Sequence, residues 1–224
     1  MFSGEYSSIL FVYKRNMGDS NNNNNNNNKN NNKWMIEAIL VLPLTHQLSR
    51  IFPVFPKMMK SGRFGASISV TGNADTGADT IAIGEPEENG ETGVAFVYKK
   101  TGNVWLLDET FKPPNVHSAF KFGSSVSVSG DFVAISELGT SDSEEQFRAH
   151  ASVYLFQRVG ASQGWRLVSQ LFASDGSKRD VIGAFVAMDD GRLATGSFNK
   201  WDSVRGNGPV YVFDVRDDPD ALSK

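Results

Sequence analysis

The chain of 224 residues contains no cysteine and only three histidines. Disulfide bonds and thiol catalysis are therefore excluded, and the lack of cysteine weighs against an oxidising compartment. The histidines, His46, His117 and His150, form no His-x-x-x-His or His-Glu zinc motif. The one Gly-x-Ser-x-Gly match, at residues 160–164, falls between two strand-like runs, whereas a nucleophile elbow joins a strand to a helix, and the sequence has no glycine-rich phosphate loop. We therefore expect no catalytic residues and a protein that is not an enzyme.

The chain also lacks a marked excess of charge of either sign. Its net charge is −3, and its 22 basic residues are scattered along the sequence. Nucleic-acid binding needs a clustered basic face, so we expect no nucleic-acid partner. We interpret the arginines, Arg158 and Arg166 among them, as solvated surface residues.

Long apolar runs are missing as well. The most apolar stretch, residues 35–44, is interrupted by Glu37 and Pro43. A transmembrane helix needs about 20 apolar residues, so we expect no transmembrane segment here. The first residues show no signal peptide, because no basic segment precedes an apolar one.

What is present is a pattern that recurs about every sixty residues. Its clearest element is a glycine that follows Phe or Ile and precedes a run of small and apolar residues. This glycine stands at Gly65, Gly123 and Gly183, at spacings of 58 and 60 residues. A second element, a run containing Val and Tyr at residues 92–98, 151–156 and 207–213, keeps step with the first. A fixed period indicates an array of one supersecondary unit.

Each unit contains four short runs rich in Val, Ile, Phe, Tyr and Ser, bounded by Gly, Asp and Asn. Such runs are typical of β-strands. In the unit that starts near residue 119 they cover residues 122–128, 132–136, 151–158 and 164–171. No segment keeps a 3.6-residue period, so we expect no helices, and the connections are too short for βαβ crossovers. The sequence predicts an all-β fold, a β-propeller of four-stranded antiparallel blades of about 58–60 residues.

The order of the motifs resembles that of FG-GAP repeats, which build the β-propeller of integrin alpha subunits. Each unit has a Phe-Gly pair or a variant of it, a weakened Gly-Ala-Pro element and, in three places, a tryptophan. The Phe-Gly positions are Phe64-Gly65, Phe122-Gly123 and Ile182-Gly183, and the tryptophans are Trp34, Trp105 and Trp165. The Gly-Ala-Pro element is represented by Gly84-Glu85-Pro86, Ser136-Glu137-Leu138 and Thr195-Gly196-Ser197. We interpret these markers as packing between neighbouring blades.

The resemblance covers residues 1–215 and describes about three and a quarter blades. We expect a partial blade at 1–60, whole blades at 61–118 and 119–178, a partial blade at 179–215 and an acidic tail at 216–224. The 13 expected strands do not close a ring, because propellers use four to eight blades of four strands. We therefore expect the remaining blades to come from a longer parent protein or, as the alternative, from oligomerisation.

A low-complexity tract interrupts the first of these units. Residues 21–32 are all asparagine except Lys29. Such a tract buries too little apolar surface to order itself, and lengthening a loop costs little. The sequence predicts a disordered insertion at residues 16–33, between the last two strands of the first unit.

A calcium site is the first candidate for bound chemistry. The integrin-type blades that the repeats resemble carry calcium in a loop with oxygen ligands at alternate positions, and calcium takes six to eight oxygens. The matching stretch here is residues 72–80, which offers Asp75 and Asp79. These carboxylates are offset, and Gly72 and Ala74 stand where ligands belong. We therefore expect an Asx-rich turn and no cofactor, with Asp75 and Asp79 as the calcium candidates.

Two acidic loops at equivalent places in successive units form the candidate binding rim. Loops on a rigid scaffold are where binding residues concentrate. The rim residues are Glu85, Glu87, Glu88 and Glu91 in one loop and Asp142, Glu144 and Glu145 in the next. We expect the two loops to be neighbours on one face, with solvated loops as the alternative interpretation.

The resemblance implies a non-catalytic module that binds a protein or a glycan through these rim loops, as in adhesion. It also implies an extracellular or cell-surface location. Three alternatives remain: an accessory propeller of a larger hydrolase, an intracellular interaction scaffold, which the missing cysteines and signal peptide favour, and a decayed gene copy without a folded product.

Overall fold

The computed structural model describes residues 9–15, 34–41, 62–73, 78–114, 121–138, 151–160, 164–172, 180–199 and 209–215. The expected asparagine insertion, the acidic tail and the three histidines lie outside the described residues. No helix in the described ranges is long and apolar enough to span a bilayer.

The described strands form four separate antiparallel sheets that follow one another along the chain. The first sheet pairs β1 (Ile9–Arg15) with β2 (Trp34–Val41). The second blade contains β3 (Ser67–Asn73), β4 (Ala78–Glu85), β5 (Val94–Thr101) and β6 (Val104–Phe111). The third blade contains β7 (Val126–Ser129), β8 (Phe132–Glu137), β9 (Ser152–Arg158) and β10 (Trp165–Leu171). The fourth blade contains β11 (Asp180–Asp189), β12 (Arg192–Asn199) and β13 (Val210–Asp214).

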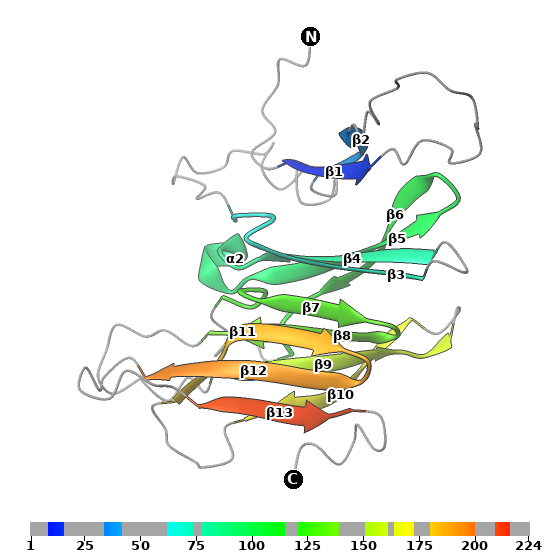
Figure 1. The fold of residues 1–224 in the computed structure, drawn as a ribbon. Coiled ribbons are helices and arrows are strands. Elements are labelled where there is room, and N and C mark those ends of the chain that lie inside the picture. Colours follow the sequence, from blue (N-terminus) through cyan, green and yellow to red (C-terminus); the bar gives the residue numbers. More distant parts are fainter. Residues whose placement is uncertain are drawn as a thin grey trace, which may run out of the picture.

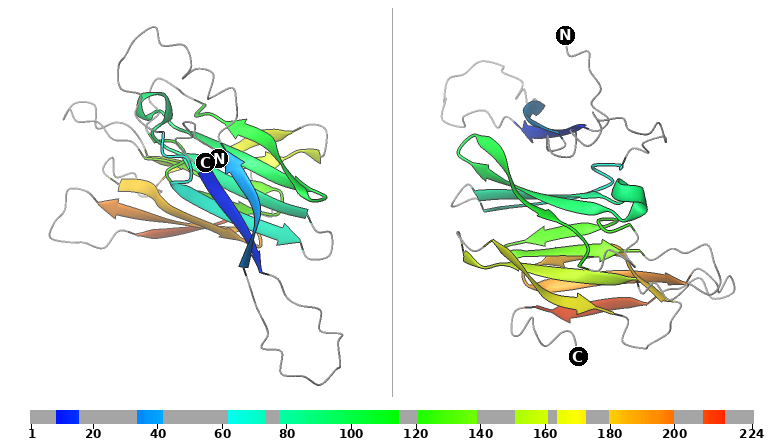
Figure 2. Two further views of the ribbon diagram at one scale, coloured as in Figure 1. Left: turned by 90° about the horizontal axis from the view of Figure 1, so that it is seen from above. Right: turned by 180° about the vertical axis from the view of Figure 1, so that it is seen from behind.

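The sheets are stacked in chain order, from β1 and β2 near the N-terminus to β13 near the C-terminus (Figure 1). Within each blade, strands adjacent in the sequence are adjacent in the sheet. The first strands of successive blades, β3, β7 and β11, also lie side by side. The view from behind shows the same stacking (right-hand view of Figure 2). The predicted all-β fold of four-stranded antiparallel blades is confirmed, and none of the described sheets closes on itself.

Each blade has a leading face, turned toward the preceding sheet, and a trailing face, turned toward the following one. Strand alternation sends neighbouring residues to opposite faces. The trailing face of the second blade and the leading face of the third share one core, whose members are Ala82, Ala95, Val97, Phe111, Phe122, Val126, Val128, Val133, Ile135, Tyr154 and Phe156. An equivalent core joins the third and fourth blades and consists of Ala134, Val153, Leu155, Leu171, Val186, Met188, Leu193 and Val215. Both faces of a boundary therefore contribute apolar side chains to one shared core.

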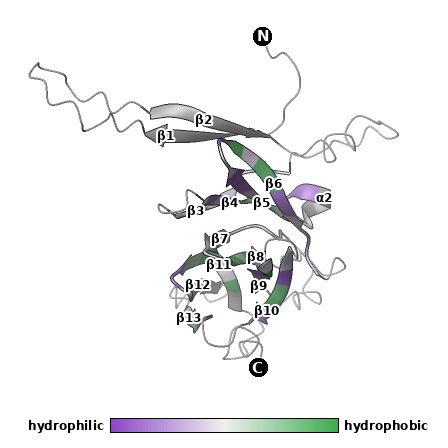
Figure 3. Ribbon diagram, turned by 90° about the vertical axis from the view of Figure 1, so that its right-hand side faces the viewer, coloured by the Kyte–Doolittle hydropathy of each residue, from purple (hydrophilic) through white to green (hydrophobic). Residues whose placement is uncertain are grey.

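Hydrophobic residues also lie along the fourth strands of the two complete blades, β6 and β10, where they alternate with hydrophilic ones (Figure 3). Each of these strands, and β2 in the first sheet, contains a bulge that leaves one residue out of register: Glu37, Asp108 and Val168. A bulge bends the strand and redirects a side chain. This recurring irregularity is what sets the position of Asp108 described below.

One short helix departs from the expectation that there are none. The helix α2 (Glu88–Glu91) forms a single turn in the connection between β4 and β5. A backbone bond from Gly93 N to Glu88 O, 2.9 Å long, closes its end. Four residues are too few to show a helical period in the sequence, so this turn was not predictable from hydrophobic spacing.

Candidate functional site

The connections between the second and third strands of the blades all start and finish at the same end of the stack. Because neighbouring strands of a blade are antiparallel, the turns between first and second strands and between third and fourth strands lie at the opposite end. The connections at this end comprise residues 86–93, 138–151 and 200–209, whereas the turns between first and second strands are as short as residues 130–131 and 190–191. In the second, third and fourth blades, the strand ends that carry the longest connection inside the blade therefore converge on one rim.

The described part of this rim is held to the backbone of the second blade. Glu87 N donates to Gly62 O over 3.0 Å, and Arg63 Nη1 lies 3.1 Å from Glu87 Oε1. This ion pair is largely exposed and contributes little to stability. It does, however, neutralise one of the predicted rim carboxylates. Glu91 ends α2 in the same connection.

Glu85 does not lie on the exposed rim as the sequence analysis expected. It is the last residue of β4 and is fully buried. Strand alternation explains this position, because Ile83 and Glu85 face the same side, the leading face that also contains Phe64. The carboxylates of Glu85 and Glu88 both lie against Gly62, where a Cβ would collide with them.

The third blade repeats this buried glutamate. Glu137 occupies the position of Glu85 and is also buried, and its Oε2 accepts a 2.6 Å hydrogen bond from the Tyr154 hydroxyl. Gln170 Nε2 donates to the same tyrosine oxygen over 3.0 Å. Burial, together with this carboxylate, raises the pKa of the Tyr154 phenol. Burial and the nearby charge of Glu85 raise the pKa of Tyr98 to about 12.

The remaining predicted site residues are only partly described. Asp142, Glu144 and Glu145 lie outside the described residues, as does Asp75. Asp79 lies in β4, and its Oδ2 is 3.6 Å from Lys100 Nζ. This carboxylate therefore already has a cationic neighbour. In the described part of the chain, no three His, Cys, Asp or Glu side chains gather closely enough to hold a metal ion.

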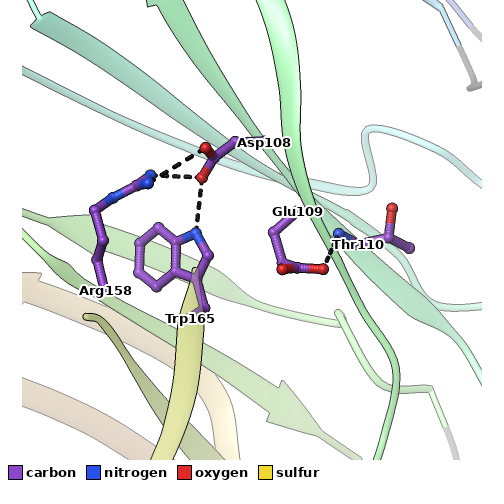
Figure 4. A network of polar contacts seen from close by, with 5 residues as sticks. All are labelled: Asp108, Glu109, Thr110, Arg158 and Trp165. Atoms are coloured by element: carbon purple, nitrogen blue, oxygen red, sulfur yellow. Dashed lines mark hydrogen bonds and ion pairs between the residues drawn. The ribbon is translucent and has the colours of Figure 1, made fainter. Parts of the chain in front are cut away.

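A polar clasp at the outer strands joins the second blade to the third (Figure 4). Asp108, at the bulge of β6, accepts hydrogen bonds from Arg158 Nη2 at 2.5 Å and from Trp165 Nε1 at 2.7 Å. The Arg158 guanidinium also lies over the Trp165 ring, 4.5 Å from its centroid. The side chain of Arg158 is only 13% exposed. The interpretation of Arg158 as a solvated surface residue is therefore wrong.

Trp105 is the equivalent tryptophan of the second blade and has a similar cation above it. Lys100 Nζ lies 5.9 Å from its ring centroid. Its buried Nε1, however, has no hydrogen-bond acceptor among the described residues. The clasp of Asp108, Arg158 and Trp165 is thus a feature of one blade boundary rather than of every tryptophan.

The clasp predicts a loss of stability in acid. Burial raises the pKa of Asp108, but the hydrogen bonds from Arg158 and Trp165 outweigh it and hold that pKa below its usual value. A depressed carboxyl pKa stabilises the fold above the unfolded-state value, and this contribution disappears as the pH falls through the folded-state value. We expect Asp108→Asn to lower the free energy of unfolding at pH 7 by about 1–2 kcal/mol, after allowance for solvent screening. Urea unfolding between pH 7 and pH 3 measures this.

The neighbouring carboxylate provides a matched control for that variant. Among the described residues, Glu109 Oε1 accepts the 2.9 Å hydrogen bond from Thr110 N and takes no part in the clasp (Figure 4). Glu109→Gln is expected to change the free energy of unfolding by less than about 0.5 kcal/mol. Equal losses for the two variants at pH 7 would contradict the clasp as a stabilising contact.

The pair Phe122-Gly123 brings the backbones of the second and third blades together. Gly65, Gly123 and Gly183 have φ values of 87°, 86° and 91°. Phe122 pairs with Gly93 in a bridge between blades, and Phe122 N donates to Thr92 O over 3.0 Å. A Cβ on residue 123 would lie 2.5 Å from the carbonyl oxygen of Val94. At Phe122 and Gly123 this geometry is packing between blades, whereas a Cβ on Gly65 would meet no atom within 4 Å.

Serine hydroxyls form a second set of contacts between the first strands. Ser69 Oγ accepts a hydrogen bond from Val128 N at 3.1 Å, and Ser67 Oγ donates to Gly123 O at 2.8 Å. At the next boundary, Ser125 Oγ accepts from Val186 N at 3.0 Å, and Ser127 Oγ accepts from Met188 N at 2.9 Å. We call these contacts the serine ladder. Its signal in the sequence is the Ser-x-Ser pair that recurs 58 residues apart, at positions 67 and 69 and at positions 125 and 127.

A comparison with protein-family models identifies an FG-GAP repeat at residues 165–213. The matched segment starts in β10, passes through β11 and β12, and ends in β13, so it spans the boundary between the third and fourth blades. The resemblance predicted from the motifs is confirmed by this match. A comparison with curated proteins found no match to the chain. An FG-GAP repeat indicates a β-propeller-like interaction module.

Proposed function

We propose that this chain, which carries an FG-GAP repeat, is a non-catalytic recognition module that binds a protein or glycan ligand, as in adhesion. The observation that carries the proposal is the convergence on one rim of the connections between second and third strands, residues 86–93, 138–151 and 200–209, each the longest connection inside its own blade. Variable loops on a rigid scaffold are the usual arrangement of a binding surface.

The scaffold beneath the rim is suited to this role because its blades are locked to one another. Shared apolar cores, the Phe-Gly contacts, the serine ladder and the clasp all join neighbouring blades. A rigid scaffold lowers the ordering cost that a loop-based binding site incurs on association. Ligand selectivity would then reside in the connecting segments, whose lengths differ from blade to blade.

The proposal is tested by shortening a rim connection. Purified chain is first screened on arrays of glycans and of extracellular protein domains. Ligands that bind are then tested against a variant in which residues 139–150 are replaced by Asn-Gly, a turn suited to adjacent antiparallel strands such as β8 and β9. We expect the variant to fold, because loop length has a small effect on stability, and to lose the ligand.

The matched control shortens a turn at the opposite end of the same blade. Residues 159–164 connect β9 and β10, and a two-residue replacement there is expected to leave binding unchanged. Binding that survives the rim variant but fails in this control would refute the rim as the ligand site. Chemical turnover of a bound ligand would refute the non-catalytic assignment.

A further inference from the structure

The first strand of the second blade exposes apolar residues that its counterparts bury. Ile68 is 48% exposed and Val70 is 66% exposed. The equivalent residues of the third blade, Val126 and Val128, are 5% and 3% exposed. In the fourth blade the same positions, 186 and 188, are 9% and 8% exposed. These later residues are covered by the trailing face of the preceding blade.

The uncovered surface belongs to an edge strand. β3 is the first strand of its sheet and pairs only with β4 within that sheet. The sheet before it consists of β1 and β2, which correspond to the third and fourth strands of a blade. Among the described strands, none therefore occupies the place that β3 fills for β7 and that β7 fills for β11.

The two observed boundaries define the chemistry that such a place requires. At both, a strand with the pattern Ser-x-Ser lies beside the next first strand and accepts its backbone N–H groups through serine hydroxyls. In the second blade, the backbone N–H group equivalent to those of Val128 and Met188 is that of Val70. A strand that covers Ile68 and Val70 must therefore have small side chains, which let the two backbones approach each other. It must also have hydroxyl acceptors at alternate positions.

We propose that β3 is a docking site for a β-hairpin of the same type as the first two strands of a blade, with Ser-x-Ser on its first strand. Such binding extends the observed interface between blades by one member. Main-chain proximity would supply affinity, and the alternate hydroxyls would supply selectivity, as in other recognition by added strands. This surface is separate from the rim connections, so the inference stands independently of the proposed function.

The last blade of a second copy does not have the required chemistry. The positions of Ser125 and Ser127 are taken there by Phe185 and Ala187, and Phe185 is 76% exposed. A phenylalanine at the first position offers no acceptor and keeps the backbones apart. The fourth blade also exposes Val210 and Val212, at 70% and 66%, so an apolar surface alone would allow the chain to associate head to tail. The loss of the serines selects against that association.

The chain itself provides the probe. A fluorescein-labelled peptide of residues 121–137 contains the first two strands of the third blade. The peptide is held at a nanomolar concentration, and the full chain is titrated into it. Fluorescence anisotropy is expected to show saturable binding. The same peptide with Ser125→Ala and Ser127→Ala is expected to bind at least about tenfold more weakly, which corresponds to the loss of two hydrogen bonds. A peptide of residues 181–197, with Phe185 and Ala187 at those positions, is expected not to compete.

Two variants of the chain locate the binding surface. Val70→Lys changes an exposed residue of β3 and is expected to weaken binding of the 121–137 peptide at least about tenfold. Val104→Lys changes a residue of β6 that is 56% exposed in the same blade and should retain full binding. The circular dichroism of both variants should match that of the unmodified chain.

Several outcomes would overturn the proposal. They are the absence of saturable binding by the 121–137 peptide, equal binding by the serine and alanine peptides, and equal losses in the two lysine variants. Concentration-dependent self-association that Val70→Lys abolishes would also overturn it, because the occupant would then be a second copy rather than a hairpin with Ser-x-Ser.

Discussion

Replacing Gly123 with alanine is expected to lower the free energy of unfolding by about 3 kcal/mol, through backbone strain and a steric collision together. Gly123 has φ of 86°, a conformation that L-residues rarely adopt. A Cβ there would also lie 2.5 Å from Val94 O and 3.2 Å from Gly84 Cα, and these atoms belong to the backbone of the preceding blade. Neither can move without shifting the blade. Urea unfolding followed by circular dichroism measures the loss.

Gly65 separates the two causes. Its φ of 87° is nearly the same, but a Cβ on residue 65 would meet no atom within 4 Å. Gly65→Ala is therefore expected to cost about 1–2 kcal/mol, from strain alone. If the two alanine variants lost the same stability, the close approach of the second and third blades at Gly123 would be refuted.

Phe122→Ala is the second change with a large expected effect. Phe122 is fully buried in the core shared by the second and third blades, and its ring centroid lies 5.6 Å from that of Tyr154. Truncation of such a residue removes apolar contacts and leaves a cavity, with a typical cost of about 3–5 kcal/mol. This is a large part of the total stability of a domain, which is about 5–15 kcal/mol. Differential scanning calorimetry would show a marked fall in the melting temperature.

An exposed phenylalanine provides the control for this variant. Phe185 is 76% exposed, so Phe185→Ala is expected to change the free energy of unfolding by less than about 0.5 kcal/mol. Similar losses for the two phenylalanines would mean that Phe122 does not pack between blades.

The features that depend on a repeated pattern could be predicted from the sequence. The glycines at 65, 123 and 183 share a left-handed φ because only glycine fits such a conformation without strain. Phe122, which precedes one of those glycines, is buried at the boundary between the second and third blades. The four-stranded antiparallel sheets follow from short apolar runs separated by turns.

The features that depend on strand alternation or on a single boundary were missed. Glu85 was assigned to an acidic loop by composition, but the alternation of β4 places it on the buried face with Ile83. Asp108 is 50 residues from Arg158 and 57 residues from Trp165, and it meets them only through a bulge and the stacking of blades. No local sequence signal connects them. The serine ladder did leave a signal, since Ser-x-Ser recurs with the period of the repeat.

The central claim is that the repeats stack as blades whose first strands are joined by serine hydroxyls. Amide hydrogen exchange, followed by NMR, tests it most directly at Val128, whose N–H donates to Ser69 Oγ across the boundary. We expect this amide to be protected, and we expect Ser69→Ala to speed its exchange while the amide of Met188, which is bonded to Ser127, keeps its protection. Fast exchange of Val128 in the unmodified chain, or protection that Ser69→Ala leaves unchanged, would contradict this arrangement of the first strands.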